Sequence, residues 1–269
     1  ETYGETERII GNWFNQKKNR KKVILASKIA GPGLPWIRNG GQNFSEEKIK
    51  KALDDSLKRL KTDYIDLYQL HWPERKTNFF GRLNYKHKEE DSWNNFEEIL
   101  VALEKFIKQG KIRYVGLSNE TPWGLSKFLE ISKIKKLPRM MSVQNCYNLL
   151  NRVFDIANSE VSIREQCGLL AYSPLAGGRL SGKYIGGNRP KNCRYTMWPG
   201  RFSRHLTSRG ELAVTKYVNL AKKYNIHPCA FSNAFVISRP FVTSSLVGAT
   251  SVENLQETIS SIDIKLSDE

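Results

Sequence analysis

The sequence predicts an α/β fold in which parallel strands alternate with helices around a closed barrel. Six short apolar runs are separated by segments with the periodicity of amphipathic helices. Runs this apolar are typical of a parallel sheet that is covered on both faces. Each run stops at a polar residue or a glycine, and the carboxyl ends of barrel strands converge on one cavity. The pattern therefore predicts one functional site at the strand ends.

The first elements are predicted from apolar spacing and from helix-capping residues. Thr6, followed by an apolar repeat, predicts a helix that closes before Arg20, and residues 23–27 follow as a strand. Ser45 with two glutamates after it predicts a capped helix that runs to Leu60. Its buried stripe is expected to consist of Ile49, Leu53, Leu57 and Leu60.

The same alternation continues along the rest of the chain. We expect strands over residues 64–70, 113–117, 141–143, 168–171 and 242–247. We expect helices over residues 95–109, 123–133, 154–166 and 210–223, with a last one from residue 252, and an irregular stretch over 173–204. Six strands are two short of a full barrel, and a helix precedes the first of them. We therefore expect a missing amino-terminal βαβ portion.

Length and composition favour one domain spanning residues 1–269. No Gly/Ser-rich linker, composition break or solenoid repeat divides the chain. The first residue is not Met, and LSDE at the carboxyl end is typical of a helix start. We therefore expect both ends to be truncated.

The net charge of +16 suits an anionic surface or nucleic acid. Most lysines, however, lie in helix-patterned stretches mixed with Asp and Glu, as in EEKIKKALDDSLKRLK, and no basic stripe alternates with aromatic residues. We expect no nucleic-acid partner. No signal-peptide pattern and no apolar run of roughly 20 residues is present, so we expect no membrane partner.

The metal- and disulfide-forming residues are widely spaced. No Cys-x-x-Cys pair and no dense disulfide framework are visible, which suits a reducing cytoplasm. The histidines outside the strand ends lack metal-ligand spacing, so we expect no metal. The residues concerned are Cys146, Cys167, Cys193, Cys229, His87, His205 and His227.

Two strand ends carry candidate catalytic side chains. Lys28 follows the first apolar run, and His71 follows YIDLYQL. A lysine there is either an exposed rim residue or a cation that shifts the pKa of a neighbour. A single histidine is often structural, but here it could also polarise a substrate oxygen. The two strands are consecutive, so the pair is a stronger indication than either residue alone.

The next strand ends offer amides and an aromatic ring. Ser118, Asn119 and Gln144 suit recognition of a carboxamide, although such residues also favour caps and turns. Tyr172 either stacks on a planar ring or packs in the core.

Two glycine-bearing segments are candidate phosphate sites. GGRLSGKY nearly matches a P-loop, but Tyr184 replaces the Ser or Thr that would hold magnesium, which argues against a nucleoside triphosphatase. Backbone N–H groups and Lys183 can still cradle a pyrophosphate. VGATSVENL leads into a helix whose amino terminus suits another phosphate. Simple turns remain the alternative for both segments.

Several blocks together resemble the aldo-keto reductase family over essentially the whole chain. They are ASK, LYQLHWP, GKIRYVGLSNE, VQNCYNLLNR, LLAYSPLAGGRLSGKY and LVGATSVENL, and HWPERKTNFFGRLNY is most similar to the bacterial Tas-like branch. The resemblance implies a TIM (β/α)8 barrel, here without its first strands and C-terminal helix. It also implies an oxidoreductase that uses NADPH, or alternatively NADH, to reduce aldehydes or ketones to alcohols.

The resemblance implies roles for individual residues. Lys28 and His71 match two of the four catalytic residues, an Asp, a Tyr, a Lys and a His. Cofactor contacts are implied at Ser118, Asn119, Gln144, Tyr172, Ser173, Leu175, Gly178, Leu180, Gly182, Lys183, Gly248 and Asn254. The last two stand where the family often has Lys and Arg, so the preference between NADPH and NADH stays open.

The catalytic Asp and Tyr depart from the family pattern. Tyr3 with Gly4 fits the segment around the Tyr, but no Asp precedes it. Tas-like members carry an insertion followed by a second segment resembling ETYGETE. We therefore favour Tyr3 as a loop residue, with the catalytic Asp and Tyr upstream of Glu1.

Two alternatives to an enzyme of this family stay open. One is a non-catalytic NADP(H)-binding sensor of the same fold, like the related potassium-channel beta subunits. The other, weaker one is a phosphate-binding barrel lyase or isomerase. For an enzyme, loop aromatics could line a substrate pocket or simply pack. They are Trp36, Trp72, Phe79, Phe80 and Trp198. Neither the substrate nor the oligomeric state can be read from the sequence.

Overall fold

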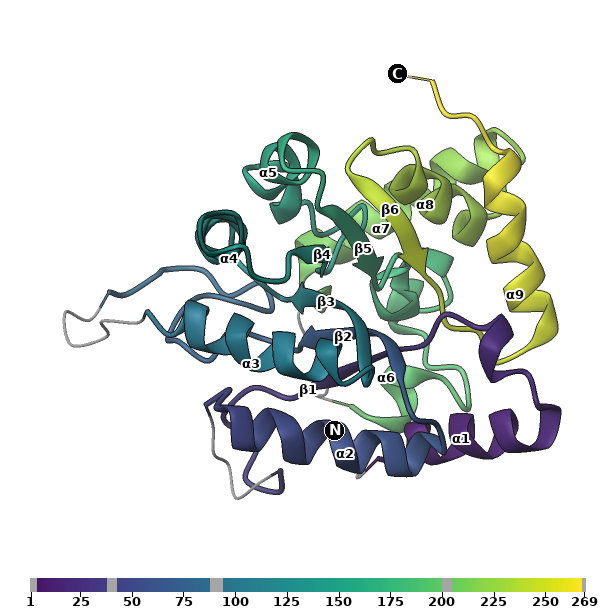
Figure 1. Ribbon diagram of the computed structural model, residues 1–269. Coiled ribbons are helices and arrows are strands. Elements are labelled where there is room, and N and C mark those ends of the chain that lie inside the picture. The colour runs from purple at the N-terminus through teal and green to yellow at the C-terminus, as the bar shows by residue number, and fades with distance from the viewer. Residues whose placement is uncertain (1–3, 38–42, 88–93, 200–204, 268–269) are drawn as a thin grey trace. The chain divides into compact units, whose positions relative to one another are not determined.

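The computed structural model describes residues 4–37, 43–87, 94–199 and 205–267 (Figure 1). The chain forms two compact units. The first unit comprises Glu1–Gln144 and Glu165–Cys167. The second comprises Asn145–Arg164 and Gly168–Glu269. Each unit repeats the strand and helix alternation that the sequence predicts.

The first unit is a four-stranded parallel sheet in the order β1-β2-β3-β4. Parallel neighbours require long crossover connections, and helices supply them here. The strands are β1 (Ala26–Ile29), β2 (Ile65–Leu70), β3 (Ile112–Ser118) and β4 (Met140–Gln144). The helical elements are α1 (Glu5–Lys17), η1 (Arg20–Lys22), α2 (Glu46–Leu60), α3 (Phe96–Lys108) and α4 (Pro122–Lys135).

Helices α1 to α4 contact one another in sequence order, and α2, α3 and α4 also contact strands of the sheet. The predicted stripe of α2 faces the core, with Ile49, Leu53, Leu57 and Leu60 each at most 9% exposed. Its lysines and acids remain on the other side, and several of them pair at i,i+4 spacing. The apolar period of the sequence therefore determines which helix face is buried.

The second unit contains a parallel pair of strands, β5 (Gly168–Tyr172) and β6 (Val242–Leu246), with Tyr172 opposite Leu246. Its core includes Tyr147, which is fully buried and stacks on Phe235 at a centroid distance of 5.8 Å. The helices are α5 (Asn158–Arg164), α6 (Arg194–Met197), α7 (Ser208–Lys223), α8 (Pro228–Ile237) and α9 (Val252–Ile259). Short 3-10 turns are η3 (Val153–Asp155), η4 (Ala176–Ser181), η5 (Ile185–Gly187) and η7 (Ser260–Asp263).

The predicted start of the first strand is wrong by three residues. β1 begins at Ala26 because the N–H of Leu25 donates to the Asp66 carboxylate at 2.9 Å, outside the strand ladder. Lys28 consequently lies inside β1, one residue before its end. The predicted cap at Ser45 is also wrong in part: Ser45 occupies the N-cap position of α2, but its side chain makes no capping hydrogen bond.

Two helical segments differ from the sequence-based prediction. The helix expected over residues 154–166 is broken into η3 and α5, where the Ser159 hydroxyl bonds the Asp155 carbonyl at 2.8 Å and so competes with regular helix hydrogen bonding. Helix α8 has no predicted counterpart. It is apolar and buried on nearly all sides, so it lacks the polar face that reveals an amphipathic helix.

All four cysteines are free thiols. Among the helices of the described ranges, we find none that combines the length and apolar character needed to cross a bilayer.

Candidate active site

The carboxyl ends of the strands in the first unit bring several predicted site residues to one edge of the sheet. Ile29 pairs with Leu70, Leu70 pairs with Leu117, and Ser118 pairs with Gln144. The residues that follow these pairs therefore leave the sheet at the same level. In a barrel enzyme, this edge carries the chemistry.

Asn119 connects three of these strand ends. Its side-chain amide donates to the carbonyl of His71 at 2.9 Å and to the Ser118 hydroxyl at 3.1 Å. The Ser118 hydroxyl in turn donates to the carbonyl of Gln144 at 2.8 Å. Asn119 and Ser118 are 7% and 2% exposed. Both amide hydrogens of Asn119 are therefore used within the protein.

Asn119 also has an uncommon backbone conformation. Its φ is 52°, in the left-handed region that Asn tolerates better than most residues. Such residues are concentrated at functional sites, where the surrounding structure holds the strain. Ser173, another predicted site residue, shows the same feature directly after β5, with φ 58°.

The imidazole of His71 is held in its neutral form. Burial lowers its pKa to about 3, and the nearby ammonium of Lys28 adds to the effect. At neutral pH His71 can therefore donate or accept a hydrogen bond, but it carries no charge. The backbone N–H of His71 also donates to the carbonyl of Ile29, the residue after Lys28, at 3.0 Å, so the two predicted catalytic residues lie on neighbouring strands.

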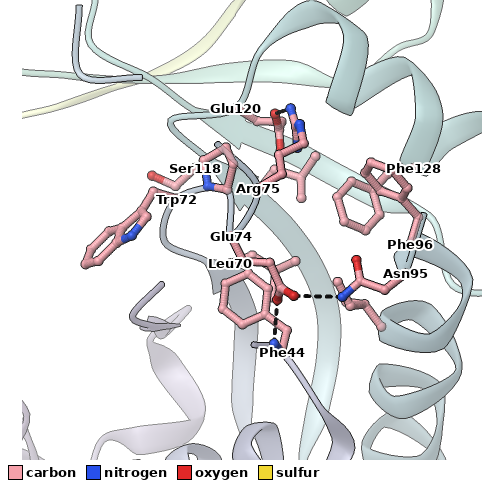
Figure 2. Close-up of a pocket in the computed structure, with 13 residues that line it drawn as sticks. Phe44, Leu70, Trp72, Glu74, Arg75, Asn95, Phe96, Ser118, Glu120 and Phe128 are labelled. Atoms are coloured by element: carbon pink, nitrogen blue, oxygen red, sulfur yellow. Dashed lines mark hydrogen bonds and ion pairs between the residues drawn. The ribbon is translucent and has the colours of Figure 1, made fainter. Parts of the chain in front are cut away.

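The sequence analysis missed an ion pair beside this site, formed by Arg75 and Glu120. The two side chains are 9% and 3% exposed and meet through two contacts, of which Nη1 to Oε2 measures 3.1 Å (Figure 2). Arg75 also donates to Thr121 Oγ1 at 2.9 Å and lies 5.0 Å above the Trp123 ring. Glu120 directly follows Asn119, so the pair joins the loop after β2 to the loop after β3.

A second carboxylate, that of the half-buried Glu74, fixes the same loop. It accepts hydrogen bonds from the backbone N–H of Phe44 and from Asn95 Nδ2, as drawn in Figure 2. Burial raises the pKa of Glu74 despite these bonds. The cavity around these residues measures about 10 Å³, room for one water molecule at most. It belongs to the wall of the site and is too small for a substrate.

In the second unit, the predicted pyrophosphate residues lie in one tight loop. Ser173, Gly178 and Gly182 all have left-handed φ angles. Asn148 anchors the loop through a 2.9 Å bond from Nδ2 to the carbonyl of Ser173. The N–H of Gly178 bonds back to the carbonyl of Leu175 at 2.8 Å.

The side chains of this loop differ in what they can offer a ligand. Leu180 is 1% exposed and fixes the loop in the core, whereas the Lys183 side chain is exposed. A Cβ built on Gly178 would lie 3.6 Å from the Lys183 ammonium, so that ammonium stands over the turn. Successive left-handed turns with a lysine above them suit a diphosphate.

Three further predicted residues also lie in the second unit. Tyr172 is the last residue of β5 and bonds the carbonyl of Asn145 through its N–H at 3.1 Å. Gly248 is exposed, with open space where a Cβ would stand. Asn254 lies in the first turn of α9, where its N–H donates to Ser251 Oγ at 3.2 Å. Ser251 thus already caps one N–H group of this predicted phosphate site.

The residues described above suit separate parts of a nicotinamide dinucleotide. Asn119 and Gln144 have the donor and acceptor chemistry of a carboxamide partner. The loop of Ser173 to Lys183 has the turns and charge for a diphosphate. Over the described ranges, no group of three His, Cys, Asp or Glu side chains that could hold a metal ion is found.

Comparison with known proteins agrees with this chemistry. Residues 1–269 match the family model described as "Aldo/keto reductase family". The chain belongs to the aldo/keto reductase family. The resemblance noted in the sequence is therefore confirmed, and so are the oxidoreductase class and the α/β barrel class, with which the parallel strands of both units agree.

Three relatives illustrate the similarity. The chain is 42% identical to protein Tas of Escherichia coli strain K12 over 272 aligned positions, which cover 100% of this chain and 78% of Tas. It is 39% identical to an "Aldo-keto reductase" of Babesia bovis, with 88% of each chain covered. It is 28% identical to "Aldo-keto reductase yakc [NADP(+)]" of Schizosaccharomyces pombe, over 99% of this chain and 72% of the relative.

Proposed function

We propose that this aldo/keto reductase reduces aldehydes or ketones to alcohols with NADPH, using Lys28 and His71 as catalytic residues. The observation that carries the proposal is the placement of the two residues on neighbouring strands, where the N–H of His71 donates to the carbonyl of Ile29, next to Lys28, at 3.0 Å. When bound, the reduced nicotinamide supplies a hydride to the carbonyl carbon. The carbonyl oxygen receives a proton from a tyrosine hydroxyl, which completes the alcohol.

Lys28 acts on the proton donor. An unperturbed tyrosine has a pKa of about 10, so it is protonated at neutral pH, but the tyrosinate left after donation is unfavourable. An ammonium close by stabilises that anion and lowers the pKa of the hydroxyl. Tyr3, which the sequence favours as a loop residue, lies outside the described residues.

His71 acts on the carbonyl. Because its imidazole is neutral, it donates a hydrogen bond to the carbonyl oxygen and does not compete with the tyrosine as a proton source. Negative charge develops on this oxygen during hydride transfer, and a fixed donor stabilises it. Asn119 holds the backbone of His71 in place for this contact.

Each part of the dinucleotide is assigned to its own group of residues. Ser118, Asn119 and Gln144 serve the carboxamide, with Ser118 acting through its bonds to the other two. Tyr172 serves the nicotinamide ring. The diphosphate is assigned to Ser173, Leu175, Gly178, Leu180, Gly182 and Lys183, and the adenosine phosphate to Gly248 and Asn254.

NADPH is proposed over NADH on limited grounds. A relative at 28% identity carries NADP(+) in its name, which supports NADPH. Gly248 and Asn254 provide no charge for the extra phosphate, which leaves NADH as the second cofactor to test. The free thiols support a cytoplasmic location. A small carbonyl compound is the proposed partner, without nucleic acid or membrane.

The rival to this proposal is a sensor that binds NADPH without useful turnover. We suggest titrating the full-length protein with NADPH, using cofactor fluorescence, and measuring NADPH consumption with 4-nitrobenzaldehyde in parallel. The proposal expects saturable binding together with consumption of NADPH. Binding without consumption would establish the sensor, and no binding would exclude both functions.

A further inference from the structure

We infer that the substrate site of this reductase selects carbonyl compounds that combine an aromatic ring with a carboxylate. The inference rests on the proposed function, because it names the substrate class for the same site. Its basis is a cavity of about 410 Å³ in the first unit. That volume falls within the range of small-molecule binding sites, about 300–1,000 Å³.

The cavity is formed by the loops that leave the two strands carrying Lys28 and His71. Pro32 and Gly33 follow β1, and the segment from Pro73 to Lys86 follows β2. The two loops are joined where Trp72 Nε1 donates to the carbonyl of Pro32 at 3.0 Å. Loops at this edge of a barrel set substrate specificity.

A chain of aromatic rings connects His71 with the cavity. The His71 ring is 4.6 Å from the Trp72 ring, which is 5.9 Å from Phe80, and Phe80 is 5.0 Å from Phe79. Phe79 lines the cavity, and the guanidinium of Arg82 lies 5.6 Å from its ring centroid. Phe79 therefore offers aromatic surface to a planar substrate body, and the buried Trp72 ring with Phe80 joins that part of the cavity wall to His71.

The charge of the cavity lining is strongly positive. Its cationic residues are Arg75, Lys76, Arg82 and Lys86, and its one carboxyl is Glu74. Arg75 is occupied by Glu120, and Glu74 is bonded to Phe44 and Asn95, with a pKa raised by burial. Arg82 and Lys86 are exposed and line the cavity, so each can meet a ligand carboxylate, and the guanidinium of Arg82 can bind it through two hydrogen bonds.

The test compares 4-formylbenzoate with its neutral methyl ester as substrates of the full-length protein. The ester is the more electrophilic aldehyde, so a preference for the acid has to come from the protein. We expect kcat/KM to be at least about tenfold higher for the acid, because one charge-assisted hydrogen bond stabilises a complex by roughly that factor. The preference should shrink as ionic strength rises.

Charge-removal variants assign the effect to residues. Arg82→Gln and Lys86→Gln should each lower the ratio of kcat/KM for the acid to kcat/KM for the ester about tenfold. Arg164→Gln is the matched control, because Arg164 is an exposed arginine outside the cavity lining.

The outcomes separate this inference from the proposed function. If acid and ester are reduced equally well, or if Arg82→Gln behaves like Arg164→Gln, the carboxylate preference is overturned while the reductase activity stands. If neither aldehyde is reduced, the proposed function fails, and the inference fails with it. A tenfold preference for the acid that is lost in the cavity variants and kept in Arg164→Gln supports both the inference and the proposed function.

Discussion

The side-chain amide of Asn119 donates a hydrogen bond of 2.9 Å to the backbone carbonyl of His71. This bond runs from the end of β3 to the residue after β2, so one strand end fixes the position of the next. The backbone of Asn119 is left-handed, with φ 52°. Cofactor binding and carbonyl polarisation are therefore expected to depend on the same residue.

Asn119→Ala is expected to impair both functions. The substitution removes the bond to His71 and the bond to Ser118, so we expect the Kd for NADPH and the kcat/KM for 4-nitrobenzaldehyde each to worsen by about tenfold or more. Asn225→Ala is the control, because Asn225 is also left-handed, with φ 54°, but is exposed after α7. If both variants changed the Kd and kcat/KM equally, the effect would come from the left-handed backbone and not from the hydrogen bonds of Asn119.

Arg75 and Glu120 are expected to be coupled in stability. Glu120→Gln leaves the 9% exposed Arg75 without its counter-ion, and we expect it to lower the free energy of unfolding by about 3 kcal/mol. The double variant Arg75→Met with Glu120→Met should recover most of that loss, because apolar groups need no counter-charge. Urea unfolding measures both. If the double variant had a lower free energy of unfolding than Glu120→Gln, the losses would add up and the two side chains would not be coupled.

Asp66 is expected to matter for stability and not for chemistry. It lies near the amino end of β2, where its carboxylate binds Arg20 at 2.8 Å and the N–H of Leu25 at 2.9 Å. Asp66→Asn should cost about 3 kcal/mol in urea unfolding and leave kcat/KM within about twofold. Glu130→Gln, which breaks the exposed pair with Lys127, should cost less than about 1 kcal/mol. If the folded Asp66→Asn variant lost most of its turnover, Asp66 would take part in the chemistry, contrary to this prediction.

His71 is expected to make folding pH-dependent. Its pKa is about 3 in the folded protein and 6.5 without the fold, so the unfolded chain binds the proton more tightly. The stability from the neutral imidazole is therefore complete above pH 6.5 and is lost as the pH falls towards 3. The difference in free energy of unfolding between the wild type and His71→Gln should narrow from pH 7 to pH 5. A constant difference would mean that His71 titrates normally.

Local patterns account for most of what the sequence predicts correctly. The buried stripe of α2 can be predicted from its apolar spacing, which lies within one helix. The polar strand ends at His71, Ser118 and Gln144 can be predicted because each directly follows an apolar run. Arg75 and Glu120 are 45 residues apart, and no local spacing connects them. The pKa of His71 depends on burial, which only the folded chain establishes.

Lys28→Met provides the most direct test of the central claim, with Lys21→Met as control because Lys21 is exposed in η1. In the full-length protein, we predict that Lys28→Met lowers kcat for 4-nitrobenzaldehyde by about a thousandfold and leaves the Kd for NADPH within about threefold, because the ammonium acts on the proton transfer. The control should resemble the wild type in both. Turnover by Lys28→Met at the level of Lys21→Met would contradict the account.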